Sequence, residues 1–312
     1  FVRTQSRTLG LQLVPYLGTV IPNVSLRGPH SYTDCRRFVM NYSQRRDRLI
    51  RQNPDTVFLL FSSSDHPKLS LYRQDSDLLY LSGIETKDTV VLLTHDGNTL
   101  VFCDGPYPKH AEALPVKLLG ARLEAELGVA KSLAYRFGHS QYADSCVTKV
   151  LSKISRRRGG RHPNVIDSHA AIGELRIIKD SKEIDLMRTA AQISARAHAV
   201  VQKEASAGMT EWELRALFEF EVHRQGCQRT AYSTCVGSGS NATILHARKF
   251  DRVLREEDLV LMDGGGEYQN YCADITRTFA IGQSSMTLAQ RKSVEAVQKA
   301  QNAAIQEARP GS

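Results

Sequence analysis

Two aspartates in the last third of the chain have the spacing of a paired-carboxylate site. Asp263 ends an apolar run and is followed by Gly264–Gly266, while Asp274 lies in a second run that begins after Gln269-Asn270. If the chain reverses at Gln269-Asn270, Asp274 lies opposite Gly265 in an antiparallel hairpin. Both carboxylates then project from the same face, roughly 5–8 Å apart at Cβ. Acids held this close repel each other unless a cation lies between them, and hard divalent ions suit such ligands.

The same two carboxylates allow other interpretations. A solvated acidic hairpin needs no cation, and a paired general acid/base site would use the two groups for proton transfer. The glycines remove side chains from one flank, so another backbone or a ligand can approach closely. His246 is the nearest candidate for a third functional side chain, although a histidine after Ile-Leu is also typical of a hydrogen-bonded core residue. The segment 237–239 lacks the spacing of a nucleotide loop.

The elements that must position these residues are predicted from capping boxes and β-type runs. Helices are expected to begin at the capping boxes. The inner side of the first helix is expected to carry Ile184, Met187, Ala191 and Val200-Val201. The capping boxes are Asp180–Glu183, Thr210–Glu213 and Thr287–Gln290. Strands are expected at residues 231–236, 259–262 and 272–280.

The first half of the chain predicts a compact α/β domain. An amphipathic helix is expected within residues 34–52. Strand-type runs are 56–62, 78–81, 89–94 and 99–103, and Asp96-Gly97 predicts a hairpin between the last two. The run Arg156-Arg157-Arg158, with Gly159-Gly160 after it, predicts a solvated linker that ends the domain.

Composition excludes several classes of protein. The chain has 312 residues, 41% hydrophobic and 24% charged, which predicts about two globular domains. It has no run of 18 apolar residues, so no membrane-spanning helix is predicted. Six scattered cysteines without a CxxC pair indicate neither a zinc ribbon nor a disulfide framework and fit a reducing compartment.

The net charge of +8 lies entirely in residues 1–170, which hold 23 Lys+Arg against 15 Asp+Glu; residues 171–312 hold 18 of each. A basic half would suit nucleic acid, but no aromatic platform accompanies the arginines, so nucleic-acid binding is the least favoured hypothesis. Residues 1–33 contain three arginines and no acid. This is the composition of a mitochondrial presequence, and a plain extended arm is the alternative.

Several segments together resemble aminopeptidase P, a family of the creatinase/prolidase/methionine-aminopeptidase superfamily with the pita-bread fold. The segments that resemble its active-site strands are VGSGSNATILH (236–246), LVLMDGGGEY (259–268) and YCADITRTF (271–279). Residues 72–83 resemble its N-terminal domain, and residues 174–187 resemble the start of its catalytic domain. The resemblance implies an α/β (α+β) protein. After the arm at 1–33 it places a creatinase-like α/β domain at 34–165 and an incomplete pita-bread domain at 170–312.

The resemblance also implies a function. The family releases the N-terminal residue that precedes proline, so the expected partners are peptide or protein N-termini with proline second. Nucleic acid and membranes are not expected partners, and a homo-oligomer is an open alternative to a monomer. Asp263 and Asp274 correspond to the first two ligands of a dinuclear Mn²⁺ site, with Asp274 bridging, and other divalent metals are alternatives. His246 corresponds to a histidine that stabilises substrate and intermediate without binding metal. A mitochondrial location is expected, with the cytoplasm as the alternative.

The end of the chain departs from the family pattern. The family completes its metal site with one histidine and two glutamates downstream, whereas residues 275–312 contain no His or Asp, and their only acids are Glu295 and Glu307. We therefore expect a C-terminally truncated enzyme, with a catalytically inactive binding module as the alternative. The helix expected over 287–309 has no sheet to cover, so the second half should be unstable alone.

Overall fold

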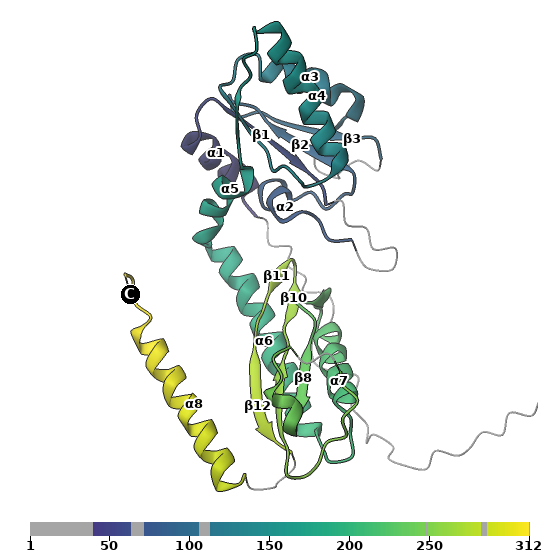
Figure 1. Cartoon of the computed structure of the whole chain (residues 1–312), viewed down its shortest axis with the longest axis vertical. Coiled ribbons are helices and arrows are strands. Elements are labelled where there is room, and N and C mark those ends of the chain that lie inside the picture. Colours follow the sequence, from purple (N-terminus) through teal and green to yellow (C-terminus); the bar gives the residue numbers. More distant parts are fainter. Residues whose placement is uncertain (1–39, 64–71, 106–112, 247–248, 282–285, 312) are drawn as a thin grey trace, which may run out of the picture. The chain divides into compact units, whose positions relative to one another are not determined.

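The computed structural model describes residues 40–63, 72–105, 113–246, 249–281 and 286–311. The predicted N-terminal arm, residues 1–33, lies outside the described residues. Within those ranges, no helix is both long enough and apolar enough to cross a membrane. The mixed α/β class is confirmed, with a six-stranded sheet in the first half and two three-stranded sheets in the second (Figure 1).

The first sheet has the strand order β4-β3-β2-β1-β5-β6. Its strands are β1 (Thr56–Phe61), β2 (Thr89–Leu93), β3 (Thr99–Cys103), β4 (Ala113–Leu114), β5 (Ser132–Ala134) and β6 (Asn164–Ile166). β2 and β3 pair in antiparallel fashion with Gly97 at φ 93° between them, so the predicted hairpin is confirmed. Every residue of β1 is buried, because both faces of this strand are covered.

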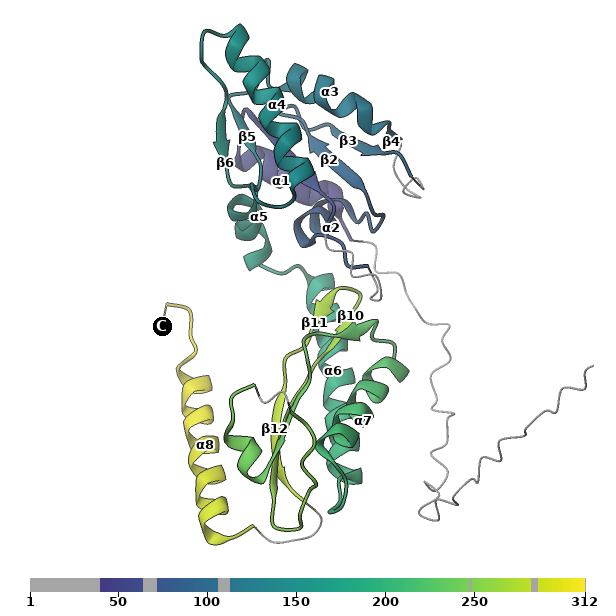
Figure 2. The same cartoon turned by 45° about the vertical axis from the view of Figure 1, so that its right-hand side comes forward.

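Helices cover both faces of this sheet (Figure 2). Val57, Leu59 and Phe61 of β1 pack with α3 (Leu119–Glu126) and α4 (Gln141–Arg157). The alternate residues, Phe58 and Leu60, pack on the opposite face. The helices on that face are α1 (Tyr42–Gln52), α2 (Ser76–Ser82) and α5 (Ser168–Ile177), and a short 3-10 turn, Val116–Leu118, precedes α3. The two-residue period of the strand thus divides its side chains between two cores.

The strand predicted at 78–81 is wrong, because these residues lie in α2. The side chain of Asp75 accepts hydrogen bonds from the backbone N–H groups of Asp77 and Leu78, both at 3.0 Å. Gly83, at φ 69°, ends the helix. Leu78 and Leu81 then lie on one buried face. A short apolar run cannot distinguish strand from helix by period, and here the cap at Asp75 decides.

The arginine run is not a linker. Arg156 and Arg157 are the last residues of α4, Arg157 forms an ion pair with Glu124 of α3, and β6 follows in the same sheet. Ile172 and Leu175 of α5 belong to the first core, although the sequence prediction placed residues 170–177 in the second domain. Their apolar side chains pack against the first sheet. The local sequence does not reveal this packing, because the partners are distant in the chain.

The second half begins with two long helices. The predicted capping boxes at Asp180, Thr210 and Thr287 are confirmed, and they begin α6 (Ser181–Glu204), α7 (Glu211–Arg224) and α8 (Leu288–Glu307). One sheet has the order β12-β9-β8 and the other β11-β10-β7. Their strands are β7 (Arg229–Thr230), β8 (Cys235–Ser238), β9 (Leu259–Asp263), β10 (Gly266–Tyr268), β11 (Tyr271–Cys272) and β12 (Thr276–Ala280).

The second core lies between α6, α7 and the β12-β9-β8 sheet. Val260 and Met262 of β9 are fully buried among the apolar side chains of both helices. The predicted inner face of α6 is confirmed at Val201, which is fully buried, but wrong at Ile184 and Met187, which are 44% and 39% exposed. The buried side of α6 carries the apolar residues Leu186, Ala190, Ile193, Ala197 and Val201, together with the polar residues Glu183, Ser194 and His198. An apolar stripe in the sequence does not reveal this face, because the face includes polar side chains whose hydrogen-bond partners are distant in the chain.

No residue of α8 is buried. Leu288, Val297 and Ile305 are each about two-thirds exposed, at 68%, 69% and 65%. The side-chain amide of Gln290 donates to the carbonyl oxygen of Glu257 at 3.0 Å. The helix therefore forms from its own cap and propensity, and packing contributes little to it.

Phe218 tests the importance of the second core. Phe218→Ala should lower the free energy of unfolding by about 3–5 kcal/mol, because the ring is fully buried beside His198 and Gly264. Phe220→Ala is the matched control on the same helix; its ring is 50% exposed, and the change should cost less than about 1 kcal/mol. Urea denaturation followed by circular dichroism measures both, and equal costs would contradict the described packing.

Candidate metal centre

The two aspartates lie on one long hairpin. Asp263 of β9 pairs with Thr276 of β12, and the same register continues through Glu267 and Cys272 at the other end. Gly265 therefore lies opposite Asp274. The chain reverses at Gln269 and Asn270, whose φ angles of 46° and 68° are those of a tight hairpin turn. The predicted reversal and the pairing of Asp274 with Gly265 are confirmed.

A tyrosine joins the two carboxylates. The hydroxyl of Tyr232 lies 2.6 Å from Oδ1 of Asp263 and 3.0 Å from Oδ1 of Asp274. Burial, reinforced by the hydrogen bonds to the two aspartates, raises the pKa of Tyr232, so the phenol keeps its proton at neutral pH. A phenol has one hydrogen to donate, so one proton serves both carboxylates. Tyr232 lies in a bend between β7 and β8, although the sequence predicts a strand over residues 231–236. A lone tyrosine has no spacing signal, so the sequence did not indicate this contact.

The glycines between the aspartates allow three close contacts. A Cβ on Gly265 would overlap the carbonyl oxygen of Ala273, so the predicted approach of another backbone is confirmed at this position. A Cβ on Gly264 would lie 2.7 Å from the ring of Phe218, and one on Gly266 would lie 2.5 Å from Sγ of Cys227. All three positions therefore exclude a side chain.

Helix α6 holds this glycine segment with two buried polar side chains. Nε2 of His198 lies 3.0 Å from the carbonyl oxygen of Gly264, and the backbone N–H of Gly266 donates to Oγ of Ser194 at 2.9 Å. Burial lowers the pKa of His198, so the ring is neutral. Because a carbonyl only accepts, Nε2 carries the proton, and Nδ1 is buried without a partner.

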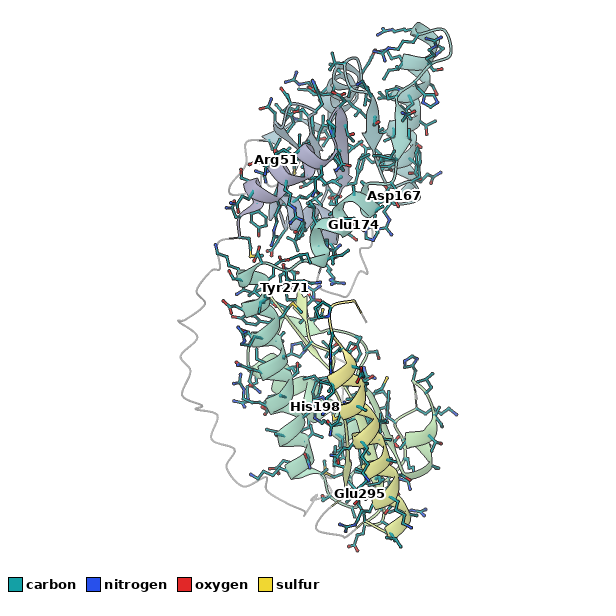
Figure 3. The ribbon with its side chains drawn as sticks, turned by 90° about the vertical axis from the view of Figure 1, so that its left-hand side faces the viewer. Arg51, Asp167, Glu174, His198, Tyr271 and Glu295 are labelled. Atoms are coloured by element: carbon teal, nitrogen blue, oxygen red, sulfur yellow. The ribbon has the colours of Figure 1, made fainter. Side chains whose placement is uncertain are left out.

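The turn end of the hairpin also contacts α6. The hydroxyl of Tyr271 on β11 donates to Oε1 of Glu183 at 2.9 Å. Burial first, and then this carboxylate, raises the pKa of Tyr271. Figure 3 labels the two residues that mark these contacts, His198 of α6 and Tyr271 of β11. Hydrogen bonds with one helix thus hold the hairpin at Gly264 and Gly266, which flank the position opposite Asp274, and at Tyr271 next to the turn.

His246 is not brought into contact with the aspartates by any described hydrogen bond or ion pair. It follows the 3-10 turn Gly239–Thr243, its side chain is exposed, and its φ of 54° is unusual for a residue other than glycine. The alternative interpretation of a hydrogen-bonded core histidine is wrong. An exposed imidazole on a loop is available to a ligand.

The residues present fit the first two ligands of a hard divalent cation. Asp263 is half-buried, Asp274 is exposed, and Tyr232 lies between their oxygens, where one proton partly offsets their repulsion. A cation would offset it more fully. Among the described residues there is no group of three or more His, Cys, Asp and Glu side chains that could hold a metal ion. Further ligands would be water, substrate or groups outside these residues.

Gly265→Ala tests the close approach of the strands. The added methyl group would overlap a backbone atom that cannot move away, so we expect the hairpin to separate, at a cost above about 3 kcal/mol. Gly173→Ala is the control, because Gly173 lies inside α5 with open space around it; this change should stabilise the chain by about 0.5–1 kcal/mol. Thermal unfolding compares the two, and a neutral Gly265→Ala would contradict the register.

Tyr232→Phe tests the shared proton through the pH dependence of stability. Above about pH 10 the unfolded phenol releases its proton while the buried one retains it, so the unfolded state binds fewer protons and stability falls as pH rises. Without the hydroxyl, the decline between pH 10 and 12 should be shallower by up to about 1.4 kcal/mol per pH unit. Urea denaturation at several pH values measures this, and identical slopes would show that Tyr232 ionises freely in the folded chain.

Comparison with known proteins agrees with the resemblance seen in the sequence. The family described as "Metallopeptidase family M24" matches residues 185–312, and "Aminopeptidase P, N-terminal domain" matches residues 42–138. The Xaa-Pro aminopeptidase of Escherichia coli is 31% identical over 86% of this chain and 68% of its own length. Intermediate cleaving peptidase 55, mitochondrial, of Arabidopsis thaliana is 29% identical over 77% of this chain and 52% of its length.

Solved structures show the same fold. Proline aminopeptidase P II from Yersinia pestis superposes with a TM-score of 0.74 at 30% identity, covering 84% of this chain and 67% of that one. Zinc-substituted E. coli aminopeptidase P in complex with product gives a TM-score of 0.71 at 29% identity, over 80% and 64%. The chain spans about two thirds of the length of these structures and of the E. coli relative. Two matching domains, a relative above 30% identity and a shared fold lead to one conclusion: the chain belongs to the aminopeptidase P family of M24 metallopeptidases.

Proposed function

We propose that this chain acts as an Xaa-Pro aminopeptidase that uses a divalent metal held by Asp263 and Asp274. The observation that carries the proposal is the pair of carboxylates around one phenol, on a hairpin whose register brings them together, in a member of this family. Manganese is the proposed metal, in a dinuclear site with Asp274 as the bridge. A bound divalent metal of this kind lowers the pKa of a water and polarises the scissile carbonyl.

The chain's own residues have distinct parts in this proposal. Asp263 and Asp274 bind the metal, and Tyr232 orients both carboxylates through its hydroxyl. Ser194 and His198 hold the backbone of the glycine segment that follows Asp263. The exposed His246 would donate a hydrogen bond to substrate and to the developing oxyanion.

The proposed substrates are peptide or protein N-termini with proline in the second position. The name of the E. coli relative indicates this specificity for that protein. The Arabidopsis relative is named as mitochondrial, and residues 1–33 have the composition of a presequence, so we assign the chain to mitochondria, with the cytoplasm as the alternative. A homo-oligomer is compatible with this function, and neither nucleic acid nor a membrane is needed for it.

A binding module without catalytic activity is the second candidate. The observation that favours it is that the described residues hold no group of three or more His, Cys, Asp and Glu side chains that could hold a metal ion. Two carboxylates alone bind a divalent ion weakly. Such a module would still bind peptide N-termini through the exposed loop at His246.

Substitution of the aspartates tests the metal site directly. Asp263→Asn and Asp274→Asn should each weaken Mn²⁺ binding at least about tenfold, because each removes one of two carboxylate ligands. Asp251→Asn, at an exposed position in the same domain, is the control and should bind Mn²⁺ like the unsubstituted chain. Electron paramagnetic resonance of free Mn²⁺ measures the binding, and equal affinities for all four proteins would refute the assignment.

Activity separates the two candidates. Release of the first residue of an Xaa-Pro peptide in the presence of Mn²⁺, lost in both aspartate variants, supports the aminopeptidase. Binding of the same peptide without cleavage at saturating Mn²⁺ supports the binding module. A peptide with alanine in place of proline is the control for substrate class.

A further inference from the structure

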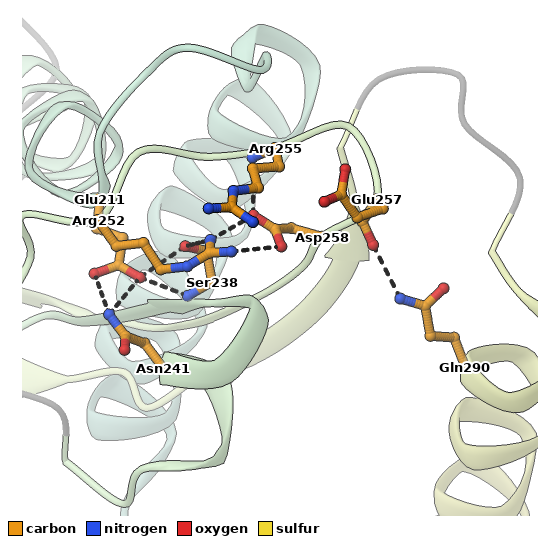
Figure 4. Close-up of polar contacts among 8 residues, drawn as sticks. All are labelled: Glu211, Ser238, Asn241, Arg252, Arg255, Glu257, Asp258 and Gln290. Atoms are coloured by element: carbon orange, nitrogen blue, oxygen red, sulfur yellow. Dashed lines mark hydrogen bonds and ion pairs between the residues drawn. The ribbon is translucent and has the colours of Figure 1, made fainter.

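Glu211 is a buried carboxylate that forms no ion pair with any of the residues that the structure describes. It is the first residue of α7 and is completely inaccessible to solvent. Its Oε1 accepts hydrogen bonds from the backbone N–H and the hydroxyl of Ser238, both at 2.7 Å, and from the side-chain amide of Asn241 at 3.2 Å (Figure 4). Its Oε2 lies 3.1 Å from the same amide. A buried charge requires such partners, because isolated it would cost several kilocalories per mole.

Arg252 is linked to Glu211 through the hydroxyl of Ser238. Nη1 of Arg252 donates to Oγ of Ser238 at 2.7 Å, so this oxygen accepts from the arginine and gives its own hydrogen to the carboxylate. Arg252 is itself paired with Asp258, Nη2 to Oδ1 at 2.8 Å. The network therefore fixes both the position of Ser238 and the direction of its hydroxyl (Figure 4).

The glycines beside Ser238 let the loop close around this carboxylate. A Cβ on Gly239, at φ 51°, would lie 2.5 Å from Oδ1 of Asp258, and one on Gly237 would lie 2.7 Å from the carbonyl oxygen of Asn241. Glycine-rich turns after a strand bind phosphate through N–H groups in nucleotide sites. Here the N–H and hydroxyl of Ser238 and the side-chain amide of Asn241 donate to the chain's own carboxylate, and the segment has no nucleotide-loop pattern.

A further hydrogen bond connects Asn241, which contacts Glu211, to the residues just before His246. The backbone N–H of Ile244 donates to the carbonyl oxygen of Asn241 at 3.0 Å, which ties Ile244 to the anchored residue. Ile244 and Leu245 are 56% and 86% exposed, so hydrophobic packing holds them weakly. Among the described residues that follow His246, the first buried side chain is that of Phe250, at 3% exposure. The position of His246 therefore depends on the hydrogen bonds that begin at Glu211.

We propose that Glu211 is the positioning residue for the loop of residues 238–246 and, through this loop, for His246. The effect on peptide binding rests on the function proposed above for His246, whereas the effect on the loop does not. Glu211 lies in a different element from the loop and donates nothing to substrate, so its contribution is conformational.

Glu211→Gln and Glu213→Gln form a matched pair. Both remove one negative charge from the first turn of α7, but Glu213 is exposed and a glutamine can replace it in the capping box. In the 312-residue chain, Glu211→Gln should accelerate amide hydrogen exchange at Ser238 and Ile244 about tenfold or more. The variant loses the negative charge that strengthens these hydrogen bonds, and its NH2 group cannot accept from the Asn241 amide as Oε2 does. It should also change the NMR signal of the His246 ring. Glu213→Gln should leave both unchanged.

Two further variants keep the test decisive. Phe218→Ala lowers overall stability but does not change the loop. If lost stability alone explained the faster exchange, the loop amides of Phe218→Ala would exchange as fast as those of Glu211→Gln; we expect them to exchange more slowly. If Glu211→Gln does not fold, Ser238→Ala removes the hydroxyl between Arg252 and Glu211 and should produce the same acceleration at Ile244. Loop amides that exchange at the same rate in the Glu211 or Ser238 variant and in Glu213→Gln would overturn the proposal.

An Xaa-Pro dipeptide separates this inference from the proposed function. It should shift the His246 signal in the unsubstituted chain and in Glu213→Gln, and shift it less in Glu211→Gln. No shift in the unsubstituted chain would refute the proposed role of His246 in binding. The loop inference would still be decided by the exchange rates alone.

Discussion

The close approach of two backbone strands at Gly265 is the constraint on which the site depends. A side chain at this position would overlap the carbonyl of Ala273, so the strands of Asp263 and Asp274 meet only because glycine stands there. A slip of one residue would turn one carboxylate to the opposite face of the sheet. The register therefore decides whether the two acids share a site, and the tight turn at Gln269 and Asn270 sets the register.

Buried polar groups of α6 and α7 set the geometry around that contact. Ser194 and His198 bind the backbone of the glycine segment, and Glu211 binds the loop that precedes His246. Replacing such groups with apolar residues could retain the core, but the hairpin and the loop would lose directional contacts. The two helices thus supply both a hydrophobic core and specific hydrogen bonds for the functional segments.

The stretch after Asp274 differs in character from the rest of the second half. β12 pairs with β9 and adds Phe279 to the core, whereas α8 buries no residue. The only acids in this stretch are Glu295 and Glu307, and both lie on α8. In the proposed site, the described metal ligands are therefore the two carboxylates of the hairpin, with Tyr232 between them.

The sequence by itself determined the features that depend on local contacts. The capping boxes at Asp180, Thr210 and Thr287, the hairpin turn and the pairing of Asp274 with Gly265 follow from neighbouring residues, as does the resemblance to the family. Only the tertiary structure decided the position of Tyr232, which is 31 and 42 residues from the two aspartates, and the network of Glu211, whose partners lie 27 and 30 residues away. It also decided the buried face of α6. These features depend on partners that are distant in the chain, and no local period or spacing specifies them.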